Sequence, residues 1–155
     1  MNIAIIGTRN PDDMQIAEVK RFIRSLPIIN TIIVSGCAYG IDELALYEAR
    51  IKGIKTKGCI PWADYNTDVQ KYCDKIILLK DNDKEAYDSV IKYHPVGNKL
   101  SQGALKLHAR NYLIISGCDL VIAFPGDTGG GTLQGIKLAE IFGIECIINP
   151  HIEII

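Results

Sequence analysis

Runs of positive charge, cysteine pairs and long apolar stretches are all missing from this sequence of 155 residues. Its 17 basic and 18 acidic residues leave a formal net charge of -1, so the overall positive charge expected of a dedicated duplex-DNA binder is absent. None of the five cysteines forms a CxxC pair, which argues against both a disulfide framework and a zinc site. No apolar stretch approaches the roughly 20 residues needed to cross a bilayer. We therefore expect a cytoplasmic protein with no metal and no membrane partner.

Short apolar runs alternate along the chain with segments of helical period. Runs of this length are typical of strands that are buried on both faces of a parallel sheet. The predicted strands are residues 2–6, 31–34, 55–60, 120–124 and 145–148. The predicted helices are residues 14–24, 41–52, 105–116 and 133–142. The alternation predicts βαβ units, and therefore an α/β fold with a mainly parallel sheet.

Residues 61–103 interrupt this alternation. Residues 75–80 fit either a strand or the end of a helix, residues 81–83 have the composition of a turn, and one helix is predicted near residues 84–93. A chain of this length leaves no room for a second full domain. We therefore expect one domain over residues 1–155, with an irregular insertion at about residues 61–103.

The first candidate site is IIGTRNP, residues 5–11, where a predicted strand ends at Gly7. Free backbone N–H groups at such a strand-to-helix turn, here at Gly7 and Thr8, form an anion site. The planar guanidinium of Arg9 matches the geometry of a phosphate. The alternative is a tight turn with a solvated arginine.

The second candidate site is VSGCAYGID, residues 34–42, again at the end of a predicted strand. Ser35 and Gly36 lie at the turn, where glycine permits close approach of a ligand to the backbone. Asp42 stands at the start of the next helix, where a carboxylate either caps the helix or holds a ribose hydroxyl.

The third and strongest candidate is FPGDTGGGTLQG, residues 124–135, between a predicted strand and a predicted helix. The N–H groups of Gly129, Gly130 and Gly131 can converge on an anion, and the Thr132 hydroxyl can donate a further hydrogen bond. The segment is neither a P-loop nor a GxGxxG fingerprint after the first strand, and we expect no separate cofactor. The alternative is a flexible glycine loop.

All three segments follow the carboxyl end of a predicted parallel strand. In a doubly wound sheet these ends share one edge, and ligands bind there at the topological switch point. The helix that precedes the glycine-rich segment carries Arg110 and Asn111, and Arg110 would reach a phosphate or a glycosidic leaving group at the same edge. A surface arginine is the alternative.

Taken in order, GTR, SGCAYGID, ARNYLI, AFPG and GGGT resemble the SLOG superfamily, which includes the DNA-processing protein DprA and the LOG phosphoribohydrolases. The motifs look closest to those of short DprA-like SLOG proteins of phages and bacteria, and they cover most of the chain except residues 61–103. The resemblance implies a single Rossmann-like, three-layer α/β domain. It also implies a nucleotide-type ligand over Gly7, Ser35, Gly36, Arg110, Gly130, Gly131 and Thr132.

Catalysis is where the sequence departs from the resemblance. LOG enzymes use an arginine together with a glutamate just after the GT pair to cleave an N-glycosidic bond. Arg110 matches that arginine, but Leu133 or Gln134 occupies the acidic position. A glutamine amide has neither the charge nor a useful pKa for this chemistry. If the chain is an enzyme, we expect Arg110 and Asp127 to be catalytic, with Asp42 as the alternative carboxylate.

Three functions remain, and we favour recognition over chemistry. The leading hypothesis is binding, for sensing or sequestration, of a nucleotide-derived or NAD-derived small molecule such as an ADP-ribose-type signal. The first alternative is an N-glycosidase that acts on a nucleoside monophosphate. The second is DprA-like binding of single-stranded DNA, which the net acidity and the lack of basic runs with interleaved aromatics disfavour. The superfamily resemblance also leads us to expect a homo-oligomer.

Overall fold

The computed structural model, which describes residues 1–127 and 130–151, is built around one six-stranded sheet. Every neighbouring pair of strands is parallel, and the order is β4-β3-β2-β1-β5-β6. The five predicted strands are all present within one residue of their expected bounds. The strands are β1 (Asn2–Gly7), β2 (Ile32–Ser35), β3 (Lys55–Ile60), β4 (Lys75–Leu78), β5 (Leu120–Phe124) and β6 (Glu145–Ile148).

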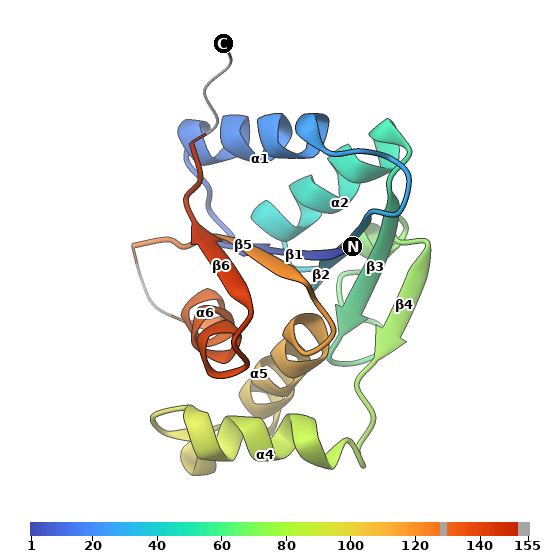
Figure 1. The fold of residues 1–155 in the computed structure, drawn as a ribbon. Coiled ribbons are helices and arrows are strands. Elements are labelled where there is room, and N and C mark those ends of the chain that lie inside the picture. The colour runs from blue at the N-terminus through green and yellow to red at the C-terminus, as the bar shows by residue number, and fades with distance from the viewer. Residues whose placement is uncertain (128–129, 152–155) are drawn as a thin grey trace.

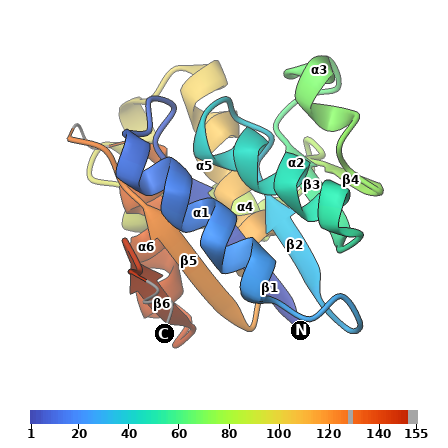
Figure 2. The ribbon, with the colours of Figure 1, turned by 90° about the horizontal axis from the view of Figure 1, so that it is seen from above.

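Helices cover both faces of the sheet. In Figures 1 and 2, α1 and α2 lie side by side on one face, and α5 and α6 lie on the other. The helix α4 packs on α5, on the side away from the sheet (Figure 1). The predicted α/β single domain with a parallel, Rossmann-like sheet is therefore confirmed. The helices are α1 (Asp13–Ser25), α2 (Ile41–Lys52), α3 (Thr67–Gln70), α4 (Lys84–Tyr93), η1 (Gly97–Lys99), α5 (Gln102–Ile115) and α6 (Gly131–Ile141).

Alternation of side chains along β1 shows how the sheet buries both faces. Ile3 and Ile5 belong to the core beneath α1 and α2, whereas Ala4 and Ile6 belong to the core beneath α5 and α6. A continuous apolar run is required by this arrangement, because both faces of β1 are buried over Ile3–Ile6.

Residues 61–103 contain more regular structure than the sequence indicates. The predicted helix at residues 84–93 is present as α4, and the ambiguous segment forms β4, which pairs with β3 at the edge of the sheet. β4 has exposed positions, with Leu78 41% exposed, and this explains why its periodicity did not separate a strand from a helix end.

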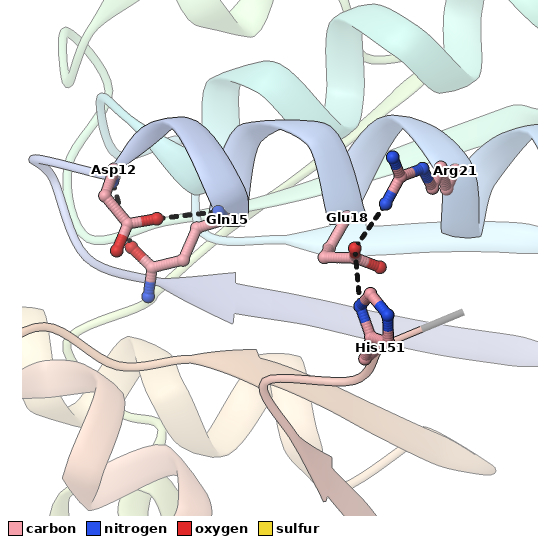
Figure 3. Close-up of polar contacts among 5 residues, drawn as sticks. All are labelled: Asp12, Gln15, Glu18, Arg21 and His151. Carbon is pink, nitrogen blue, oxygen red and sulfur yellow. Dashed lines mark hydrogen bonds and ion pairs between the residues drawn. The ribbon is translucent and has the colours of Figure 1, made fainter. Parts of the chain in front are cut away.

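The start of α1 is fixed by a capping box, and its middle is joined to the chain after β6 (Figure 3). The Gln15 amide donates to Asp12 Oδ1 at 2.7 Å, and the Asp12 amide donates to Gln15 Oε1 at 3.1 Å. The buried carboxylate of Glu18 lies 2.6 Å from Arg21 Nη1 and 3.0 Å from His151 Nδ1. The contact between Glu18 and His151 joins the segment after β6 to the first helix.

Candidate functional site

A pocket of about 360 Å³ lies at the carboxyl edge of the sheet, where the loops after β1, β2 and β5 meet α5 and the starts of α2 and α6. The strand order reverses between β1 and β5, so the pocket occupies the topological switch point. The structure thus brings together most of the predicted site. The predicted residues that line the pocket are Gly7, Thr8, Arg9, Asp42, Arg110, Asn111, Gly130, Gly131 and Thr132.

Thr8 holds the loops around the pocket together. Its backbone N–H donates to the carbonyl of Phe124 at 2.9 Å, and its carbonyl accepts from the N–H of Ile41 at 3.1 Å. Its hydroxyl accepts from the N–H of Asn10 at 3.1 Å. One residue therefore joins the end of β1 to the end of β5 and to the start of α2, which fixes three walls of the pocket.

The start of α6 presents backbone N–H groups to the pocket. Gly130 is the N-cap residue, its φ is 120°, and no side chain of residues 1–127 or 130–151 caps the helix. The N–H groups of the first helical turn have no partner within the helix, and Gly131 and Thr132 from this turn line the pocket. The Asn111 side chain donates to the carbonyl of Gly131 at 3.2 Å and so anchors the turn to α5. This geometry suits an anion.

Arg110 is held almost completely inside the protein, with 6% of its surface exposed. Its Nη1 donates to the carbonyls of Gly36 and, at 3.4 Å, Cys59, while Nε donates to Asn111 Oδ1 at 3.3 Å. The guanidinium carbon lies 5.5 Å from the centre of the Tyr65 ring. Within the described chain Nη2 has no hydrogen-bond partner, so one side of the guanidinium remains available to a ligand in the pocket.

Asp42 organises the turn after β2 and does not cap the end of its own helix. Its Oδ2 accepts from the N–H groups of Gly36 at 3.0 Å and Ala38 at 3.4 Å, whereas the N-cap of α2 is Gly40 without a side-chain cap. Burial raises the pKa of the Asp42 carboxyl, although the positive charge of Arg110 and the amide hydrogen bonds oppose this effect. Of the two alternatives for Asp42, capping of α2 is not observed, because its Oδ2 accepts from the preceding loop.

Several predicted residues lie elsewhere. Ser35 is fully buried at the end of β2. Gly36 does not line the pocket, and its carbonyl accepts a hydrogen bond from the Arg110 guanidinium. Asp127 is exposed in the bend after β5 and is not among the residues that line the pocket. Gly129 is outside the described residues. Of the two catalytic candidates, Arg110 lines the pocket and Asp127 is not among the described lining residues.

Five pocket residues were missed by the sequence analysis: Ile6, Asn10, Ala38, Ile114 and Gly126. Four of them lie inside or directly beside the three motifs, so a wider reading of each motif would have included them. Ile114 lies one helical turn after Arg110, on the same face of α5, and this i, i+4 spacing was the available signal.

Over residues 1–127 and 130–151, no group of three or more His, Cys, Asp or Glu side chains could hold a metal ion. In the same part of the chain, no helix is long and apolar enough to cross a membrane.

A parallel α/β sheet with a polar pocket at its switch point defines a Rossmann-like domain. The family model described as DNA recombination-mediator protein A matches residues 1–153, and the chain belongs to this family. A comparison with curated proteins found no match.

Solved structures agree with this assignment. DNA processing protein A from Streptococcus pneumoniae is 25% identical with a TM-score of 0.69, and the match covers 95% of this chain and 49% of that one. The Helicobacter pylori protein, described by its single-stranded DNA binding mode, is 25% identical with a TM-score of 0.70, and the match covers 96% of this chain and 64% of that one. A molybdenum cofactor binding protein from Rippkaea orientalis shares the fold at 19% identity and a TM-score of 0.66, with 95% and 74% covered. The chain therefore spans about half of the Streptococcus pneumoniae protein and just under two thirds of the Helicobacter pylori protein.

Proposed function

We propose that this domain binds a small nucleotide-derived anion in the pocket at the carboxyl edge of the sheet, for sensing or sequestration. The observation that carries the proposal is the first turn of α6, which has no side-chain cap among the described residues and lines the same pocket as Arg9 and Arg110. Backbone N–H groups and a guanidinium are the usual partners of a phosphate. A pocket of about 360 Å³ is within the range of small-molecule sites.

The placement of carboxylates favours binding over N-glycosidic cleavage. Hydrolysis needs a carboxylate beside the scissile bond, and Asp127 lies outside the pocket lining. Asp42 does line the pocket, but two backbone N–H groups already occupy its Oδ2. The position after Thr132 is Leu133, which is 50% exposed, and the next is the amide Gln134.

Binding of single-stranded DNA is the second candidate, and family membership is the observation that favours it. The matched Helicobacter pylori structure is described by its single-stranded DNA binding mode. A pocket for one phosphate would serve either a free nucleotide or a nucleotide within a strand. The net charge of -1 favours the free nucleotide. A DNA strand carries a phosphate at every nucleotide, and an extended basic surface binds it more strongly.

Calorimetric titration with AMP, ADP-ribose and a thymidine oligonucleotide tests both candidates. We expect saturable binding of at least one nucleotide, and at least about tenfold weaker binding for Arg9→Ala, because a charge-assisted hydrogen bond contributes about 1.5–3 kcal/mol. Arg24→Ala is the matched control, since Arg24 is an exposed arginine in the last turn of α1, a helix length away from the pocket.

The same samples separate the outcomes. Binding of neither nucleotide by the folded protein would reject the proposal, and salt-dependent binding of the oligonucleotide alone would establish the second candidate in its place. Chromatography of the titrated mixtures detects any free base. Release of a base would show that the pocket is an active site.

A further inference from the structure

Two cysteines that are distant in sequence meet beside the pocket. Sγ of Cys37, in the loop after β2, lies 3.6 Å from Sγ of Cys73, which follows α3. All five cysteines are free thiols in this structure. A disulfide has an S–S distance of about 2.0 Å, so the two sulfur atoms would have to approach by about 1.6 Å.

The surrounding structure leaves space for this contact and for little else. A Cβ atom at Gly58, in β3, would lie 2.5 Å from Sγ of Cys37 and 2.7 Å from Sγ of Cys73. Any side chain at this position would collide with both sulfur atoms, so the contact between them requires a glycine here. On the other side, the Asn66 side chain donates to the carbonyl of Cys37 at 3.0 Å and fixes that loop.

The backbone of Cys37 is also constrained. Its φ is 57°, in the left-handed region that a non-glycine residue adopts only at a cost of about 1–3 kcal/mol. The flanking residues Gly36 and Ala38 are the ones whose N–H groups donate to Asp42. The loop that holds the sulfur in contact with Cys73 is therefore set by the same hydrogen bonds that shape the pocket.

The two sulfur atoms differ in environment, and the difference suits two roles. Cys37 is fully buried, whereas Cys73 is only partly buried and can meet a solute. The hydrogen bond from Cys37 lowers the pKa of the Cys73 thiol, and the same hydrogen bond, together with burial, raises the pKa of Cys37. Of the two thiols, Cys73 therefore loses its proton more readily, and the thiolate is the nucleophilic form of a cysteine.

We propose that Cys37 and Cys73 form a redox-modification site, in which a hydroperoxide converts the two thiols into a disulfide. In the first step the Cys73 thiolate attacks the O–O bond, taking one oxygen to form a sulfenic acid and releasing an alcohol or water after protonation. In the second step Cys37 sulfur attacks the Cys73 sulfur, the S–S bond forms, and the hydroxyl leaves as water with the Cys37 proton. The two thiols are oxidised by two electrons, which reduce the hydroperoxide.

Peptide mapping of the full chain tests the site. Reduced protein is freed of reductant, treated with hydrogen peroxide, alkylated and digested with trypsin without reduction. The expected product is peptide 25–50 joined to peptide 72–75, lighter than the sum of the two by two hydrogen atoms and separated again by a phosphine reductant. Cys146→Ser, which removes another partly buried cysteine on β6, is the control and should give the same linked product.

Variants assign the two roles. Cys37→Ser should leave a sulfenic acid at Cys73 that reacts with dimedone, and Cys73→Ser should leave Cys37 reduced at the same peroxide concentration. The wild-type map does not depend on the folding of either variant. If peroxide oxidised Cys73 to the sulfinic acid or joined it to a second molecule without joining it to Cys37, the proposal would be overturned.

Discussion

Replacement of Gly36 by alanine tests how tightly the second motif is packed against Arg110. The added Cβ would lie 2.8 Å from Arg110 Nη1, 2.9 Å from its Cζ and 3.0 Å from Asp42 Oδ2, where ordinary contacts are 3.4–4 Å. The guanidinium cannot retreat freely, because Nη1 donates to the carbonyl of Gly36 itself. Loss of one hydrogen bond from a charged donor costs about 1.5–3 kcal/mol, so we expect Gly36→Ala to lower the free energy of unfolding by about 2–3 kcal/mol.

Urea unfolding followed by far-UV circular dichroism measures this effect. Gly103→Ala is the control, because Gly103 lies in the first turn of α5, the helix that carries Arg110, and an added Cβ meets no atom within 4 Å. Alanine favours a helix over glycine by up to about 1 kcal/mol, so this variant should be as stable as the wild type or slightly more stable. A Gly36→Ala protein that unfolds at the same urea concentration as the wild type would refute the packing argument.

Three further predictions concern buried groups and the pocket. The pKa of Asp42 is raised above its usual value of 3.8, so the folded state should lose stability as the pH rises from 3.8 through the folded-state pKa. Asp42→Asn should flatten that part of the curve of unfolding free energy against pH. Burial, with the nearby His94 and Arg110, lowers the pKa of His108 from 6.5 to about 4, so the free energy of unfolding should fall as the pH drops from 6.5 to about 4. An NMR titration of the His108 ring should give a midpoint of about 4, and His108→Gln should reduce this loss of stability. Thr132→Val should weaken nucleotide binding by roughly fivefold to tenfold in calorimetry without changing the unfolding midpoint, because it removes one pocket hydroxyl and keeps the side-chain volume.

The fold could be predicted from the sequence because the central strands β1, β2 and β5 are almost entirely apolar. Residues 55–60 and 120–124 were identified at their observed bounds, and the three glycine-containing segments met at one edge as the βαβ topology requires. Local sequence patterns were therefore sufficient to predict both the sheet and the position of the pocket.

What could not be predicted depends on contacts between distant segments. The direction of the Asp42 carboxylate is set by the loop at Gly36, and no periodicity encodes it. The contact between Cys37 and Cys73 depends on the pairing of β2 with β3 and on the segment that follows α3. Edge strand β4 is partly exposed on its surface, so its sequence pattern was weaker than that of the central strands.

The most direct test of the proposed function is an amide chemical-shift map of the labelled protein during titration with AMP and ADP-ribose. We predict that the largest shifts occur at Thr8, Gly130, Gly131 and Thr132, the backbone positions that line the pocket, together with the side chain of Arg110. Shifts that cluster elsewhere on the protein, or no shifts at saturating nucleotide, would contradict the assignment of this pocket as the binding site.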